Sequence, residues 1–65
     1  MSDDAAKHEL VANRVMERMS GFIQGIGMNG AEARQIVDRA VAEDPSAPEY
    51  DIEAKARAWM LIALA

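Results

Sequence analysis

Residues 22–32, with the sequence Phe-Ile-Gln-Gly-Ile-Gly-Met-Asn-Gly-Ala-Glu, decide the fold because one helix ends and the next begins within them. Gly27 can adopt the left-handed conformation that follows a helix, and Met28 is the apolar residue that then folds back toward the helix end. Asn29 is a favourable N-cap residue, and Glu32 stands at capping-box spacing from it. A joint of about three residues makes the two helices neighbours in space.

The residues before this joint predict a long first helix over residues 3–26. Its apolar residues recur in steps of three and four and form one broad stripe; they are Val11, Val15, Met19, Phe22 and Ile26, with Ala12, Met16 and Ile23 beside them. Ser2 or Asp3 is placed to cap its start. Gly21 and Gly25, four residues apart, favour a close crossing with another helix, and a weak point or an early helix end are the alternatives.

The residues after the joint predict a second helix over residues 30–43 and a third over residues 47–65. The second carries a clean apolar stripe, made of Ala33, Ile36, Val37, Ala40 and Val41. Pro45 ends it because proline pushes the preceding residue out of helical geometry. Ser46, at capping-box spacing from Glu49, is the predicted cap of the third helix, and a later start capped by Asp51 is the alternative. Pairs across one turn are expected between opposite charges: Arg34 with Asp38, Arg39 with Glu43, Asp51 with Lys55, and Glu53 with Arg57.

The third helix carries more apolar residues than one face can hold. Its inward face is expected to contain Ile52, Ala56, Trp59 and Ala63. Residues 59–65 are nevertheless apolar around the whole circumference, whereas a bundle of short helices buries only one stripe of each. Met60, Leu61 and Leu64 are therefore predicted to project to the flanks of the helix, and Leu10 is a smaller apolar anomaly on the first helix. The predicted partner or dimer interface is Leu10, Trp59, Met60, Leu61 and Leu64.

The chain has 65 residues, and we take residues 1–65 as a single all-α domain, a small three-helix bundle with a long first helix. A chain this short buries only about 60% of the surface that its unfolded form exposes. It contains no cysteine, so no disulfide compensates for the small core. The excess of apolar surface predicts assembly, most simply as a homodimer.

The composition argues against an enzyme and against a metal or cofactor site. Without cysteine there is no thiolate nucleophile, and the single histidine, His8, excludes a site of several histidines. The chain has no Ser-His-Asp order and no glycine-rich loop between a strand and a helix. We interpret His8 as a half-buried helical residue rather than a general base. We expect no catalytic residue, no cofactor and no small-molecule substrate.

The predicted function is a protein–protein interaction. We expect a small non-enzymatic module that acts as a regulator, adaptor or inhibitor of a larger protein through an apolar helical surface. Its partners would be a second copy of itself, a larger protein, or both. A nucleic-acid partner is disfavoured because 11 acidic residues against 7 basic ones give a net charge of −4.

The alternative is a helix-turn-helix DNA-binding regulator that uses residues 22–37. Two helices around a tight, glycine-containing turn match this motif, and Ala33 and Ile36 fall where inward residues are needed. This function requires a contiguous basic face that joins Arg14, Arg18, Arg34 and Arg39.

Two segments resemble the ubiquitin-associated domain, which is also a small three-helix bundle. One is the Met-containing turn Ile26-Gly27-Met28, and the other is Asp-Ile-Glu-Ala at residues 51–54 followed by Trp59. The turn lacks the Met-Gly-aromatic order of that family, and the first helix is longer, so we assign no family.

The chain begins with polar and acidic residues, which differ from a signal peptide. The longest apolar run, residues 59–65, is far shorter than the roughly 20 residues needed to cross a bilayer. We expect a cytoplasmic protein.

Overall fold

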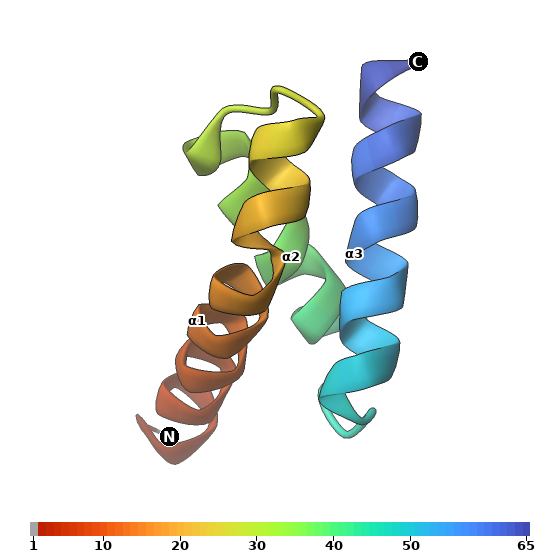
Figure 1. Cartoon of the computed structure of the whole chain (residues 1–65). Coiled ribbons are helices and arrows are strands. Elements are labelled where there is room, and N and C mark those ends of the chain that lie inside the picture. The colour runs from red at the N-terminus through yellow and green to blue at the C-terminus, as the bar shows by residue number, and fades with distance from the viewer. Residues whose placement is uncertain (1) are drawn as a thin grey trace.

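Three helices joined by two short connections form the computed structural model, which describes residues 2–65, with side chains described from Ala5 onward (Figure 1). Helix α1 spans Ser2–Gly25, α2 spans Gly30–Glu43 and α3 spans Glu49–Leu64. No strand occurs in these described residues, so the prediction of an all-α, three-helix chain is confirmed. The predicted cap of the first helix, at Ser2 or Asp3, falls outside the described side chains.

The molecule is elongated, with extents of 35, 16 and 16 Å. At 1.5 Å per residue, α1 alone is about 36 Å long and sets the long dimension. Helix α2 packs against both other helices, whereas α1 and α3 contact each other less extensively. Figure 1 shows α1 and α3 running along the molecule with α2 behind them. From Ala5 to Leu10, α1 contributes no buried side chain, so this part extends past the core.

The joint between α1 and α2 forms as the sequence predicts. Gly27 has a positive φ of 72°, and the Met28 and Gly27 amides donate to the carbonyls of Ile23 and Gln24, each at 3.1 Å. These are the two hydrogen bonds of a Schellman motif. The Asn29 side chain then accepts hydrogen bonds from the amides of Ala31 (2.7 Å) and Glu32 (3.4 Å), which caps α2. These hydrogen bonds fix the end of α1 and the start of α2 within residues 23–32.

The expected close crossing at Gly21 and Gly25 is wrong. A Cβ atom built at either glycine meets no heavy atom of a neighbouring element within 4 Å. No helix backbone approaches this face of α1, and Gly25 is simply the last residue of the helix.

Two glycines are expected to respond to alanine in opposite ways. Gly21 lies inside α1 beside open space, so Gly21→Ala should raise the free energy of unfolding by about 1 kcal/mol through higher helix propensity. Gly27 needs its positive φ, so Gly27→Ala should lower that free energy by about 1 kcal/mol. Urea denaturation followed by circular dichroism measures both changes. Shifts of the same sign at the two positions would contradict this account of the joint.

The connection between α2 and α3 differs from the expected one. Helix α2 ends before Pro45, as predicted, but α3 begins after Pro48, which offers no side-chain cap. The Pro48 carbonyl already accepts the amide of Asp51 at 2.9 Å, so the helix is under way before Asp51 could cap it. The Ser46 hydroxyl donates instead to the Asp44 carboxylate at 3.4 Å. Both predicted caps, Ser46 and Asp51, are therefore wrong.

The core is a single cluster of small and medium apolar side chains. Helix α1 supplies one stripe, α2 a second and α3 a third, and Met28 closes the end at the joint. The buried residues are Ala12, Val15, Met19, Ile23, Met28, Ala33, Val37, Ala40, Val41, Ile52, Ala56 and Met60. The stripes predicted for the first two helices supply all of these residues on α1 and α2, with Val11, Met16, Phe22, Ile26 and Ile36 half-buried around them.

The inward face of α3 is rotated from the expected one. Ile52 and Ala56 are buried as predicted, but the third core residue is Met60, whose exposed fraction is 0%. Trp59 is only half-buried, and Ala63 is exposed. The placement of Met60 on the flank is therefore wrong: its side chain lies in the monomer's own core and is not available to a partner.

Candidate functional site

Helix α3 exposes a second apolar face, on the side away from the core. Five of its exposed residues follow one another at intervals of three and four positions and therefore share one side of the helix. We call this face the outer stripe; it consists of Tyr50, Ala54, Ala58, Leu61 and Leu64. The exposed fractions of its large side chains are 79% for Tyr50, 51% for Leu61 and 49% for Leu64. All five residues are exposed in the described chain.

Arg57 also projects from this side of α3, but its charge is directed toward α1. Its guanidinium pairs with Glu53 at 3.2 Å and lies 5.5 Å from the ring centroid of Phe22 on α1. A cation held over an aromatic ring in this way gains electrostatic stabilisation. The outer stripe therefore has one charged residue among its apolar ones, and the guanidinium of that residue is held toward α1.

A groove between α2 and α3 forms a separate apolar feature. We call it the Trp59 groove; it has a volume of about 460 Å³ and is lined by Ile36, Arg39, Glu43, Trp59, Ile62 and Ala63. The three residues from α2 lie at helical spacing along one face, and so do the three from α3. The groove is an open trough between α2 and α3 rather than a closed cavity. Ile62, with an exposed fraction of 70%, forms one rim.

Two cations lie against the indole of Trp59. The Arg39 Cζ atom is 5.8 Å from the ring centroid and the Lys55 Nζ atom is 5.9 Å from it. Within the described residues, neither cation belongs to an ion pair, although Arg14, Arg18, Arg34 and Arg57 all do. The pairs expected between Arg39 and Glu43 and between Lys55 and Asp51 are therefore not formed. Two positive charges, Arg39 in the groove lining and Lys55 beside the indole, therefore lie at the groove with one negative charge, Glu43.

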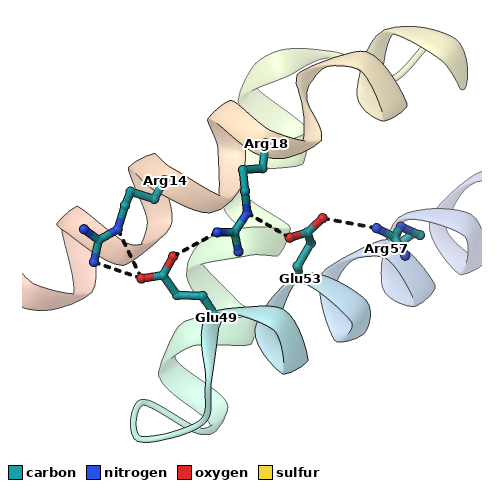
Figure 2. Close-up of polar contacts among 5 residues, drawn as sticks. All are labelled: Arg14, Arg18, Glu49, Glu53 and Arg57. Carbon is teal, nitrogen blue, oxygen red and sulfur yellow. Dashed lines mark hydrogen bonds and ion pairs between the residues drawn. The ribbon is translucent and has the colours of Figure 1, made fainter.

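A ladder of alternating charges joins α1 to α3, as Figure 2 shows. Glu49 pairs with Arg14 at 2.8 Å and with Arg18 at 3.5 Å. Glu53 pairs with Arg18 at 3.1 Å and with Arg57 at 3.2 Å. We call these five residues the charge ladder. It fastens the first two turns of α3 to the middle of α1, where few other contacts join the two helices.

The charge ladder makes a stability prediction. Glu53→Gln removes the charge that serves two arginines, so we expect a loss of about 1 kcal/mol of unfolding free energy at low salt. Raising the NaCl concentration from about 0.05 M to 0.5 M should shrink this loss, because these arginines are half-exposed and salt screens them. Asp38→Asn, which breaks only the Arg34 pair at 2.9 Å, is the matched control and should cost about half as much. Equal losses in both variants would contradict the assignment of two stabilising ion pairs to Glu53.

The arginines required for DNA binding do not form a free basic face. Arg14 and Arg18 belong to the charge ladder. Arg34 pairs with Asp38, as predicted, and also donates to the Asn13 side chain at 2.8 Å. Arg39 lies at the Trp59 groove. Carboxylates therefore already neutralise three of the four cations.

The structure separates the residues of the predicted interface. Leu10 has an exposed fraction of 52%, but it lies beside Pro45 and Ser46, close to the start of α3. Leu61 and Leu64 lie at the other end of α3, about 20 Å away at 1.5 Å per residue. Of the five predicted residues, only Leu61 and Leu64 share one exposed surface, while Trp59 belongs to the groove.

Sequence reasoning missed Tyr50 and the groove residues. Tyr50 could have been found, because it stands four residues before Ala54 and eleven before Leu61 and so shares their side of the helix. The groove depends on how α2 and α3 pack, and no local pattern reports this. His8 is half-buried, in agreement with its interpretation as a helical residue.

In residues 2–65, no helix is both long and apolar enough to cross a membrane. Across residues 5–65, whose side chains are described, His, Asp and Glu form no cluster of three that could hold a metal ion. Comparison with protein-family models, with curated proteins and with solved structures finds no match for this chain.

Proposed function

We propose that this protein is a non-enzymatic interaction module, which forms a homodimer through the outer stripe and acts as a regulator, adaptor or inhibitor of a larger protein. One observation supports this proposal above the others: α3 is apolar on its exposed side as well as on its buried side. The buried side already completes the core with Ile52, Ala56 and Met60. The outer stripe therefore has no role in the core of the monomer. Polar side chains on this face would leave that core unchanged.

The size of the outer stripe favours a reversible dimer. Tyr50, Leu61 and Leu64 together expose the equivalent of nearly two whole side chains. Burying a large apolar side chain contributes roughly 1.5–3 kcal/mol, so each copy gains roughly 3–5 kcal/mol. Interfaces at the small end of the range are typical of transient complexes. We expect the two copies to associate at micromolar concentrations.

The order of small and large side chains along the outer stripe suits a two-fold contact. Tyr50 and Leu61 are large, and Ala54 and Ala58 between them are small, while the guanidinium of Arg57 on the same side is held toward α1. In an antiparallel pair, each large side chain of one copy can lie over the small residues of the other, which lets the helices approach closely. The Trp59 groove lies on a different side of α3 and stays open in such a dimer, which leaves a surface for a larger protein.

The wild-type protein tests the assembly directly. Sedimentation equilibrium over a range from about 1 to 100 µM should give a mass that rises from 7.1 kDa toward twice that value. A mass of 7.1 kDa across the whole range would remove the homodimer from the proposal.

The second candidate function is a helix-turn-helix regulator, which the tight Gly27 joint favours. The neutralised arginines and the net charge of −4 weigh against it. We expect no gel shift with duplex DNA at about 0.15 M salt, where proteins with a basic face still bind nonspecifically. A specific shift that weakens steeply with added salt would reverse the order of the two functions.

A further inference from the structure

We propose that the Trp59 groove binds an amphipathic helix of another protein that carries carboxylates beside its apolar face. This inference rests on the proposed interaction function and names the chemistry of its larger partner. The groove is distinct from the outer stripe, because its walls are formed by one face of α2 and the adjoining face of α3. Three observations carry the inference: the shape of the groove, its charges and the position of Trp59.

The shape fits a helix. Ile36, Arg39 and Glu43 recur at helical spacing along α2, and Trp59, Ile62 and Ala63 do so along α3. A trough between two helices receives a third helix through apolar side chains one turn apart, and about 460 Å³ accommodates a few of them. Trp59 supplies a large, half-buried aromatic surface to the lining, and it is the type of residue that dominates binding energy at interfaces.

The charges select an acidic partner. Arg39 and Lys55 both lie within 6 Å of the indole, and neither forms an ion pair with a described carboxylate. An incoming carboxylate would pair with these cations while an adjacent apolar side chain covers the ring. Such complementarity fixes the register of a helix and excludes basic partners. Glu43 provides one opposite charge at the groove, where a single basic residue of the same partner would fit.

A second copy of this chain fits the groove less well. A two-fold contact centred on the groove would bring Arg39 and Lys55 of both copies together, and like charges at the centre of an interface oppose association. The two apolar surfaces of α3 therefore receive different occupants: another copy at the outer stripe and an acidic helix at the groove.

Two synthetic helical peptides of about 18 residues, both without tryptophan, test this inference. They share one leucine face, and the flanking positions carry glutamates in one peptide and lysines in the other. Trp59 is the only tryptophan of the chain, so its fluorescence reports on the groove alone. We expect the glutamate peptide to shift the Trp59 emission to shorter wavelength with saturation, and to bind at least about tenfold more tightly than the lysine peptide.

Matched charge reversals locate the contact. Lys55→Glu should weaken the glutamate peptide about tenfold, whereas Lys7→Glu, the same change on an exposed part of α1, should alter its affinity less than about twofold. Adding Arg39→Glu to Lys55→Glu should reverse the preference toward the lysine peptide. Circular dichroism establishes that each variant is folded before binding is compared.

The inference is overturned if the wild-type protein binds the two peptides with equal affinity or prefers the lysine peptide. It is also overturned if Lys55→Glu and Lys7→Glu weaken the glutamate peptide equally, or if the Trp59 emission shows no saturable shift up to about 1 mM peptide. Each titration is repeated with Leu61→Asp, which alters the outer stripe only. Binding that persists in this variant assigns the groove independently of the dimer. If the wild-type protein dimerises but does not bind the glutamate peptide, the groove assignment is removed and the homodimer is unaffected.

Discussion

Met60→Ala is expected to unfold much of the protein at 37 °C. The Met60 side chain is fully buried in the core, and truncation of a buried methionine to alanine costs roughly 2–5 kcal/mol. A domain of 65 residues has a total stability of roughly 3–10 kcal/mol. The substitution therefore removes a large part of that stability. Thermal unfolding followed by circular dichroism should show a midpoint lowered by at least about 10 °C, since 1 kcal/mol corresponds to 4–8 °C in a domain of this size.

The neighbouring residue provides the matched control. Leu61 is half-exposed, so Leu61→Ala should change the stability of the monomer by less than about 1 kcal/mol. The two variants must be compared at one low protein concentration, because dimerisation stabilises the folded state by mass action. If Leu61→Ala destabilised the protein as much as Met60→Ala under these conditions, the orientation of α3, with Met60 in the core and Leu61 on the outer stripe, would be wrong.

Leu61→Asp is expected to abolish self-association while the monomer stays folded. The carboxylate would enter the apolar centre of the outer stripe, and an unpaired charge inside an interface costs several kcal/mol. In the monomer the same carboxylate is solvated, so the helical circular dichroism should be nearly unchanged. The expected effect on the dimer is at least a hundredfold weaker association.

Ile62→Asp is the control for this variant. It places the same charge one residue further along α3, at an exposed position on the rim of the Trp59 groove. The dimer should therefore survive Ile62→Asp. Loss of association in both variants would show that any added charge at this end of α3 disrupts the assembly, and the outer stripe would no longer be assigned.

The sequence predicts the all-α fold and the joint between α1 and α2 because their signals are local. Gly27 and Asn29 each satisfy backbone groups within four residues of themselves, so their roles can be recognised without knowledge of the tertiary structure. The stripes of α1 and α2 are equally clear, since polar residues mark the opposite face of each helix.

The orientation of α3 could not be predicted in the same way. Residues 59–65 are apolar on every side, so the pattern does not distinguish Met60 from Trp59 as the inward residue. The choice depends on the angle at which α3 crosses α2, which places Met60 in the core and leaves Trp59 at the groove.

The charge ladder was also beyond local reasoning. Arg14 and Glu49 are 35 residues apart, and they meet only because α3 runs beside α1 in a particular register. The pattern shows which charges a helix exposes but not which charges face them from another helix, so the pairing of Arg14 and Arg18 with α3 could not be predicted.

Sedimentation equilibrium of the wild type, Leu61→Asp and Ile62→Asp at the same micromolar concentrations tests the central claim, that α3 has a second functional apolar face. The account predicts a mass approaching twice 7.1 kDa for the wild type and for Ile62→Asp, and 7.1 kDa for a folded Leu61→Asp. A wild-type protein that stays at 7.1 kDa, or a Leu61→Asp variant that associates as strongly as the wild type, would contradict it.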